Sequence, residues 1–152
     1  MSFLNVDEQF EKVTQNNPEW LKSIRSQGLS RFNSVGIPTV KDEEWKYTNI
    51  DAIAKETFEV SVDAQIKETA AFQEYSAGDT INIVLVNGQL STELSTITDL
   101  PQGVEIIALT QAVNADKPQL KKIFEKYSAS ESSAFIALNT ALFNSGIFIN
   151  IS

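Results

Sequence analysis

GIPTVKDEEWKYTNID, residues 36 to 51, is the stretch with the most distinctive composition in this sequence. Gly36 is of the type favoured just after a helix, and Pro38 prevents simple helical continuation. Thr39 followed three residues later by Asp42 has the form of a capping box, although Glu or Gln is the usual third-position partner. The segment therefore predicts the end of one helix, a turn, and the start of a short second helix.

The carboxylates of Asp42, Glu43 and Glu44 are the most obvious candidate chemical site within this stretch. Acids in this number suggest a hard-metal site or an acid–base pair. However, carboxylates in the first turn of a helix are also stabilised by its dipole, by about 0.3–1 kcal/mol each. Successive helical residues point about 100° apart, so three adjacent acids do not converge on one ion. We interpret them as helix-start residues and predict no catalytic, cofactor-binding or metal-binding residue here.

Trp45 and Tyr47 are the second candidate in the same stretch. Exposed aromatics stack on ligands, but such side chains more often bury their large area and anchor an element to a core or an interface. We therefore interpret both as anchors, with Lys46 between them as a solvated charge or a partner for a nearby acid. Binding of a small ligand or peptide by the Trp45/Tyr47 segment is the alternative.

The residues before this stretch, 1 to 35, predict helices. Asn5 is placed as an N-cap before two acids, and Asn17-Pro18 restarts the chain with Asn as a cap and Pro at the first helical position. Apolar residues recur at helical spacing, with a gap at Gly28: Phe10, Val13, Trp20, Leu21, Ile24, Phe32 and Val35. We expect residues 1–56 to form an N-terminal helical region, in which Asp51 caps a short helix ending at Lys55.

The residues after position 56 predict a small mixed α/β region, 57–152. Asn87-Gly88 is the strongest short hairpin signal, and it directly follows the β-branched run at 81–86, which we expect to be a buried strand. The predicted strands are 58–62, 81–86, 89–94 and 104–109. The predicted helices are 65–75, 116–127 and 132–143. The fold class is therefore α+β.

The last residues, Ile147 to Ile151, predict a strongly apolar strand. An edge strand of this kind is an aggregation hazard unless it is paired. We expect it to lack a partner within these 152 residues, because the chain is cut from a longer protein where a sheet begins. The alternative is a complete domain in which this strand pairs with residues 81–86.

Composition excludes several classes of function. The chain carries a formal net charge of −8, with neither Cys nor His. Disulfides and thiolate or imidazole chemistry are therefore impossible, and a serine triad has no base. Nucleic-acid binding is not expected, because it needs clustered Lys and Arg. No apolar run approaches the roughly 20 residues of a membrane span, and the N-terminus is no signal peptide. We expect a cytoplasmic protein without membrane partners.

The motif Arg31-Phe32-(x)3-Gly36-Ile-Pro-Thr39-(x)2-Asp42-Glu-Glu-Trp-Lys-Tyr-Thr48 resembles the N-terminal signature of the SufB/SufD family of iron–sulfur cluster assembly scaffolds, in its SufD form. Three later pieces agree in order and spacing: IVLVNGQLSTEL (83–94), LPQGV (100–104) and FIALNTALFNSGIF (135–148). The DEEWKYT run is specific, whereas each later piece is weak alone. The resemblance covers most of the chain from about Arg31 onward.

This resemblance implies a non-catalytic scaffold that acts through protein contacts. It implies an N-terminal helical region leading to a right-handed parallel β-helix that begins near residue 152. It also implies two partners for the full-length protein, a SufB-like paralogue and a SufC-like ATPase. The family's partner-contact and candidate cluster residues lie in later parts, so none is carried over here. This segment is expected to bind no cofactor, and the iron–sulfur cluster belongs to the whole complex.

Two other functions compete with the scaffold. One is the small acidic α/β domain that binds a peptide or ligand through Trp45 and Tyr47. The other is a metal-dependent hydrolase that uses the acids from Asp42 to Glu44.

Overall fold

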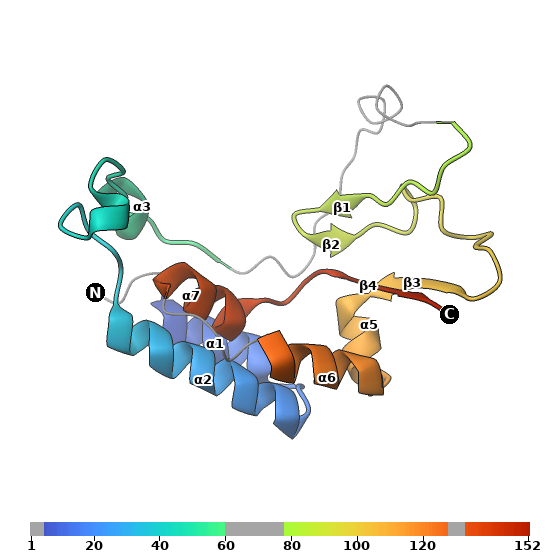
Figure 1. Cartoon of the computed structure of the whole chain (residues 1–152), viewed down its shortest axis with the longest axis horizontal. Helices are drawn as coiled ribbons and strands as arrows, with labels where there is room; N and C mark the ends of the chain where they lie inside the picture. Colours follow the sequence, from blue (N-terminus) through green and yellow to red (C-terminus); the bar gives the residue numbers. More distant parts are fainter. Residues whose placement is uncertain (1–4, 60–77, 128–132) are drawn as a thin grey trace. The chain divides into compact units, whose positions relative to one another are not determined.

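The structure is a computed structural model that describes residues 5–59, 78–127 and 133–152 (Figure 1). The described residues form runs of helices and two small antiparallel sheets, which agrees with the α+β class. The elements are α1 (Val6–Thr14), α2 (Glu19–Val35), the 3₁₀ helix η2 (Glu43–Trp45), α3 (Asp51–Lys55), β1 (Leu85–Val86), β2 (Gln89–Leu90), β3 (Val104–Ala108), α5 (Leu109–Asn114), α6 (Pro118–Tyr127), α7 (Ala134–Leu142) and β4 (Ile147–Ile151).

The chain divides into two compact units. The first combines Met1–Val60 with Asp116–Phe143, and the second combines Ser61–Ala115 with Asn144–Ser152. The helices α1, α2, η2, α3, α6 and α7 therefore belong to the first unit, while the four strands and α5 belong to the second. The helical unit thus draws on sequence from both sides of residue 56. Residues 58 and 59 are not in a strand, and the rest of the predicted strand 58–62 and the predicted helix 65–75 lie outside the described residues.

Local chemistry sets both ends of α2. Gly36 follows the helix with φ 71°, a conformation that favours glycine, and its N–H donates to the carbonyl of Phe32 at 2.8 Å. At the other end Pro18 stands at the N-cap, so α2 begins at Glu19, one residue later than predicted. Asn17 does not cap α2: its side-chain N–H donates at 2.9 Å to the carbonyl of Val13, near the end of α1. Its amide closes the preceding helix instead.

The core of the first unit forms where α2 packs against α7. The two helices run antiparallel, because Phe32 clusters with Ala134 and Ala137 while Gly28 lies against Ala137 and Ala141. The three alanines, spaced at i, i+3 and i+7, are all buried. Their small side chains allow a close approach of the two backbones, and Val6 of α1 completes the cluster. Gly28 therefore lies where the backbones of α2 and α7 come close together, and it is not a gap in the apolar face.

The hairpin in the second unit forms as predicted, but its strands are short. Asn87 and Gly88 have φ values of 47° and 83°, and β1 pairs antiparallel with β2 around them. Two positive φ values define the type I′ turn that Asn-Gly favours. The prediction of a buried strand over 81–86 is wrong, because Ile81 and Leu85 are exposed and only Leu85–Val86 is a strand. The predicted return strand 89–94 likewise shrinks to Gln89–Leu90.

Side-chain hydroxyls explain the shortening of that hairpin. The N–H of Asn82 donates to Thr96 Oγ1 at 2.7 Å, and the N–H of Val84 donates to Ser95 Oγ at 2.9 Å. Side-chain hydroxyls thus accept these two N–H groups, which in a longer strand would donate to the backbone of the neighbouring strand. Ser and Thr hydroxyls compete with regular secondary structure in this way.

The last strand, β4, pairs antiparallel with β3 over five residues. The register runs from Val104 opposite Ile151 to Ala108 opposite Ile147, and the N–H of Ser152 donates to the carbonyl of Gly103 at 2.9 Å. The expectation that this strand has no partner is therefore wrong, and so is the alternative partner at 81–86. The predicted strand 104–109 is confirmed except for its last residue. Leu109 begins α5, which the sequence did not predict.

The two C-terminal helices of the first unit agree well with the sequence. Predictions at 116–127 and 132–143 correspond to α6 (Pro118–Tyr127) and α7 (Ala134–Leu142).

No helix in the described ranges has both the length and the apolar character that crossing a membrane requires.

Candidate functional site: an acidic, aromatic interaction surface

The segment from Thr39 to Trp45 is held by one carboxylate. Asp42 Oδ2 accepts hydrogen bonds from the Thr39 N–H at 2.6 Å and from Thr39 Oγ1 at 3.2 Å. This is one half of the predicted capping box. The Thr39 hydroxyl oxygen accepts the N–H of Lys41 at 3.2 Å, not that of the third helical residue, and only the single 3₁₀ turn η2 follows.

A second polar side chain starts α3. Asn49 Oδ1 accepts the N–H of Asp51 at 2.8 Å, and Ile50 occupies the N-cap position that was predicted for Asp51. Asp51 is instead the first residue of the helix, where its carboxylate is favoured by the helix dipole. The prediction of a turn followed by a short helix ending at Lys55 is confirmed.

Trp45 and Tyr47 have different environments, although only one residue separates them. The Trp45 ring lies 5.3 Å from the ring of Phe135 in α7, centroid to centroid, at an interplanar angle of 45°. Tyr47 is 92% exposed, with Lys46 Nζ 5.6 Å from its ring centroid. The anchor interpretation is confirmed for Trp45 and wrong for Tyr47. Trp45 fixes the segment to the helical unit, and Tyr47 is presented to solvent.

Other apolar side chains of the segment are exposed together with Tyr47. They are Val40, Ile53 and Phe58, each about half exposed. Residues 39–59 carry six carboxylates and three lysines, a local net charge of −3. We call residues 39–59, with these four exposed apolar side chains and the six exposed carboxylates, the acidic face. Exposed aromatic and aliphatic groups with polar surroundings are typical of surfaces that bind other proteins.

The acids of this segment do not form a metal centre in the structure. Across residues 5–59, 78–127 and 133–152, no three His, Cys, Asp or Glu side chains come together as a set of metal ligands. Asp42 directs one carboxylate oxygen at Thr39. The hydrolase hypothesis, which needs Asp42, Glu43 and Glu44 to converge, finds no support in this geometry.

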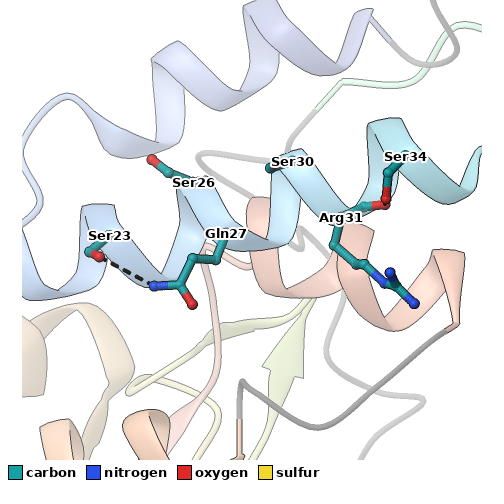
Figure 2. A pocket seen from close by; sticks show the side chains of 6 residues that line it. All are labelled: Ser23, Ser26, Gln27, Ser30, Arg31 and Ser34. Carbon is teal, nitrogen blue, oxygen red and sulfur yellow. Dashed lines mark hydrogen bonds between the residues drawn. The ribbon is translucent and has the colours of Figure 1, made fainter.

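The exposed side of α2 carries a shallow polar groove (Figure 2). Figure 2 shows the residues that line it: Ser23, Ser26, Gln27, Ser30, Arg31 and Ser34. Several of their polar groups bond one another or the helix backbone. Gln27 Nε2 donates to Ser23 Oγ at 3.4 Å, and Ser34 Oγ donates to the Arg31 carbonyl at 2.8 Å. The groove therefore has the character of an ordinary solvated helix face.

Arg25 is a buried charge that sequence reasoning missed. It is only 3% exposed and lies on the α2 side that faces α7. Its Nε donates to Asn17 Oδ1 at 2.8 Å, and one terminal nitrogen donates to the carbonyl of Ala141 at 3.1 Å. Its guanidinium carbon lies 4.0 Å from the centroid of the Phe143 ring. Burial lowers the pKa of Arg25 to about 10, so the group stays cationic at neutral pH.

The contacts of Arg25 continue into a row of aromatic rings. Phe143 stacks on Phe124 of α6 with centroids 4.9 Å apart and an interplanar angle of 11°, and Phe124 lies 6.2 Å from Trp20 of α2. Arg25 thus joins the last turn of α7, the end of α1 and this aromatic row. The arrangement is structural, since each described polar contact of the guanidinium is made to this chain itself.

Truncating Trp45 and Tyr47 separately is expected to distinguish the anchor from the exposed residue. Trp45→Ala removes the ring contact with Phe135 and is expected to lower the free energy of unfolding by about 2 kcal/mol, less than the 3–5 kcal/mol of a fully buried tryptophan because Trp45 is only partly buried. Tyr47→Ala is expected to change it by less than about 0.5 kcal/mol. Urea denaturation followed by circular dichroism measures both. Equal losses would contradict the separation of roles.

One comparison with known proteins identifies the family. The chain matches the family model described as SufBD protein N-terminal region over residues 4–152. No curated protein and no solved structure matches it. The match extends the resemblance seen from Arg31 onward to almost the whole chain, and it confirms the SufB/SufD family while leaving the SufD form a prediction. This chain belongs to the SufBD N-terminal region family and has a part in iron–sulfur cluster assembly.

Proposed function

We propose that this chain is the N-terminal portion of a SufD-type scaffold for iron–sulfur cluster assembly, acting through protein–protein contacts and not as an enzyme. The observation that carries the proposal is the family match over residues 4–152. The DEEWKYT run favours the SufD form over SufB. The acidic face supports the contact role, because Trp45 holds the segment in place while Tyr47 stays exposed.

The partners in this proposal are a SufB-like paralogue and a SufC-like ATPase, which bind the full-length protein in the cytoplasm. In this proposal the full-length scaffold also contains a right-handed parallel β-helix. This segment binds no cofactor and supplies no catalytic residue. The cluster is held by the complex as a whole, which agrees with a sequence that has neither a thiolate nor an imidazole ligand to offer.

Co-expression of the full-length protein with its SufB-like and SufC-like partners tests the scaffold role. The tagged full-length protein is expected to elute with both partners in one complex of defined mass, measured by size-exclusion chromatography with light scattering. A folded full-length protein that elutes alone would contradict the proposal. To separate SufD from SufB, the same protein is expressed with a SufD-like partner only. A complex with SufD but not with SufB would assign the chain to the SufB form.

A second candidate is the small acidic binding domain, favoured by the 92% exposure of Tyr47. Trp45 is already in contact with Phe135, so Tyr47 and its exposed neighbours would carry the binding. In that case the chain binds a peptide or ligand by itself, without any Suf partner, and the full-length protein makes no complex with the Suf partners.

A further inference from the structure

Helix α6 presents a basic and apolar surface on a chain that is acidic as a whole. From Pro118 to Tyr127 the helix has three lysines and one glutamate, a net charge of +2, whereas the whole chain carries −8. Lys122, Ile123, Lys126 and Tyr127 are all exposed. At about 100° per residue, these four positions lie within about 140° of the helix circumference. We call the surface that they form the basic face.

The basic face consists of two parallel rows, because positions four apart are neighbours on a helix. Lys122 and Lys126 form one row, and Ile123 and Tyr127, which are 52% and 64% exposed, form the other. Lys126 Nζ lies 5.0 Å from the centroid of the Tyr127 ring, so the two rows are in contact. A ligand for this surface must therefore match a line of positive charge beside a line of apolar side chains.

The lysine row is not neutralised by a carboxylate of the described ranges. The third lysine of α6 shows the contrast, because Lys121 Nζ lies 3.8 Å from Glu125 Oε1 on another side of the helix. Lys122 and Lys126 make no such ion pair within residues 5–59, 78–127 and 133–152. Like charges at i and i+4 destabilise a helix. Binding of carboxylates from another molecule would remove this repulsion.

The other side of α6 holds the basic face in place. Leu120 is buried, and Phe124 stacks on Phe143 with ring centroids 4.9 Å apart. Phe124 also lies 6.2 Å from Trp20, near the beginning of α2, beside which α6 is seen in Figure 1. Binding to the basic face therefore requires no ordering of the α6 backbone, and such preorganisation increases affinity.

We propose that the basic face binds an acidic amphipathic helix of a partner protein, one with two carboxylates four residues apart beside a row of apolar side chains. A helix laid along α6 at an interaxial distance of about 8–10 Å places such carboxylates against Lys122 and Lys126. Its apolar row covers Ile123 and Tyr127, and the exposed apolar area of both sides is then removed from water. The proposal goes beyond the scaffold function and does not depend on it.

The charge of the whole chain favours a short acidic segment over an extended polyanion. A nucleic acid or an anionic membrane presents negative charge over a wide surface, which the net charge of −8 repels. A helix with two carboxylates meets mainly the local charge of α6, because charges more than about 8–10 Å away are screened at physiological salt. The apolar row of the basic face also suits a protein ligand.

Fluorescence anisotropy with a labelled helical peptide tests the proposal on the 152-residue chain. The probe has about 18 residues of alanine, leucine and glutamate, long enough for a helix, with glutamates four apart beside a row of leucines. One helix face is smaller than a standard interface, so we expect a dissociation constant on the order of 10–100 μM. The same peptide with glutamine in place of glutamate is expected to bind at least about fivefold more weakly. Equal binding of the two peptides, or no saturation by about 1 mM protein, would contradict the proposal.

Charge reversal on α6 shows whether the peptide binds this surface. Lys122→Glu with Lys126→Glu is expected to weaken binding of the glutamate peptide at least about tenfold, with the circular dichroism spectrum unchanged. Lys41→Glu with Lys55→Glu is the matched control, because it makes the same change in net charge at two exposed lysines outside α6. The control is expected to lose less than about threefold. Equal losses in the two double variants would show a response to net charge alone and overturn the assignment to the basic face.

The apolar row is tested by a variant that leaves the lysines in place. Ile123→Gln with Tyr127→Gln is expected to weaken binding at least about fivefold, because the leucines of the peptide then cover polar side chains. An unchanged affinity in this folded variant would refute the two-row arrangement.

Two polyanions decide whether the ligand is a protein segment. Single-stranded DNA of about 20 nucleotides and vesicles of phosphatidylglycerol are expected to bind more weakly than the glutamate peptide at the same ionic strength. If either bound more tightly than the peptide and lost its binding in the Lys122→Glu/Lys126→Glu variant, the ligand would be an extended polyanion and the proposal would be wrong.

Discussion

Replacing Gly28 by valine is expected to destabilise the helical unit by about 3 kcal/mol or more, because the new side chain has no room between α2 and α7. A Cβ atom at this position would lie 2.9 Å from the carbonyl oxygen of Ala137 and 2.9 Å from the backbone nitrogen of Ala141. Both neighbours are backbone atoms of a helix, so neither moves without moving α7. Total stabilities of domains are about 5–15 kcal/mol, so a loss of this size is large.

Alanine at the same position isolates the close contact from helix propensity. Exchanging Gly for Ala inside a helix normally stabilises it by roughly 0.5–1 kcal/mol. At Gly28 the single added Cβ meets backbone, so Gly28→Ala is expected to lose about 1–2 kcal/mol in spite of that gain. The sign of the change in the free energy of unfolding, and not only its size, therefore tests the packing of α2 against α7.

Tryptophan fluorescence during urea denaturation measures both Gly28 variants. The chain's two tryptophans, Trp20 and Trp45, belong to the first unit, so their emission reports on that unit. Ser30 provides the matched control, since it lies on the exposed side of the same helix. Ser30→Ala is expected to be neutral or slightly stabilising, and Ser30→Val is expected to cost less than about 0.5 kcal/mol. If Gly28→Ala were as harmless as Ser30→Ala, the close approach of the two helices would be wrong.

Features with a local cause could be predicted from the sequence. Asn87-Gly88 forms its hairpin because two positive φ values are a property of those two residues. Gly36 ends α2 for the same kind of reason. The anchoring role of Trp45 also follows from residue type, although the choice of Phe135 as its partner does not.

Features that depend on distant partners could not be predicted in this way. The partner of β4 is β3, which lies about 40 residues earlier, and neither strand's own pattern specifies that pairing. The run at 81–86 has strand composition, but hydroxyls from Ser95 and Thr96 take its backbone donors. Tyr47 and Trp45 are equivalent in sequence terms, and only the position of α7 decides which one is buried. The composition of the sequence therefore indicated the acidic face, and the structure shows which of its side chains are exposed.

Arg25 gives the second large expected effect: Arg25→Ala is expected to cost about 3 kcal/mol. The change leaves the buried Ala141 carbonyl and the partly buried Asn17 Oδ1 without this donor, and an unsatisfied buried group costs about 1–3 kcal/mol. It also removes the side chain that lies against the Phe143 ring and opens a cavity there. In the sequence Arg25 is one of several charged residues on a helix. The cost of replacing it could therefore not be predicted without the structure, which shows that it is buried.

Two further substitutions separate the charge of Arg25 from its shape. Arg25→Met keeps most of the volume against Phe143 and removes a charge whose burial is unfavourable, as the lowered pKa of about 10 indicates. Arg25→Lys keeps a charge but loses the planar fork that reaches two acceptors in different directions. We expect losses of about 1–2 kcal/mol for Met and about 2–3 kcal/mol for Lys.

The order of these three variants decides what Arg25 contributes. If Lys is worse than Met, the geometry of the guanidinium matters more than its charge, because lysine supplies the charge and methionine does not. The same urea denaturation, followed by Trp20 and Trp45 emission, gives the order, with Arg31→Met on the exposed side of α2 as the control. Arg31→Met is expected to change stability by less than about 0.5 kcal/mol. If Arg25→Lys kept the wild-type stability, Arg25 would contribute through its charge and not through the geometry of its guanidinium. The bonds to Asn17 and Ala141 join the ends of α1 and α7 through a single side chain, and this role requires the two directions that only the arginine fork provides.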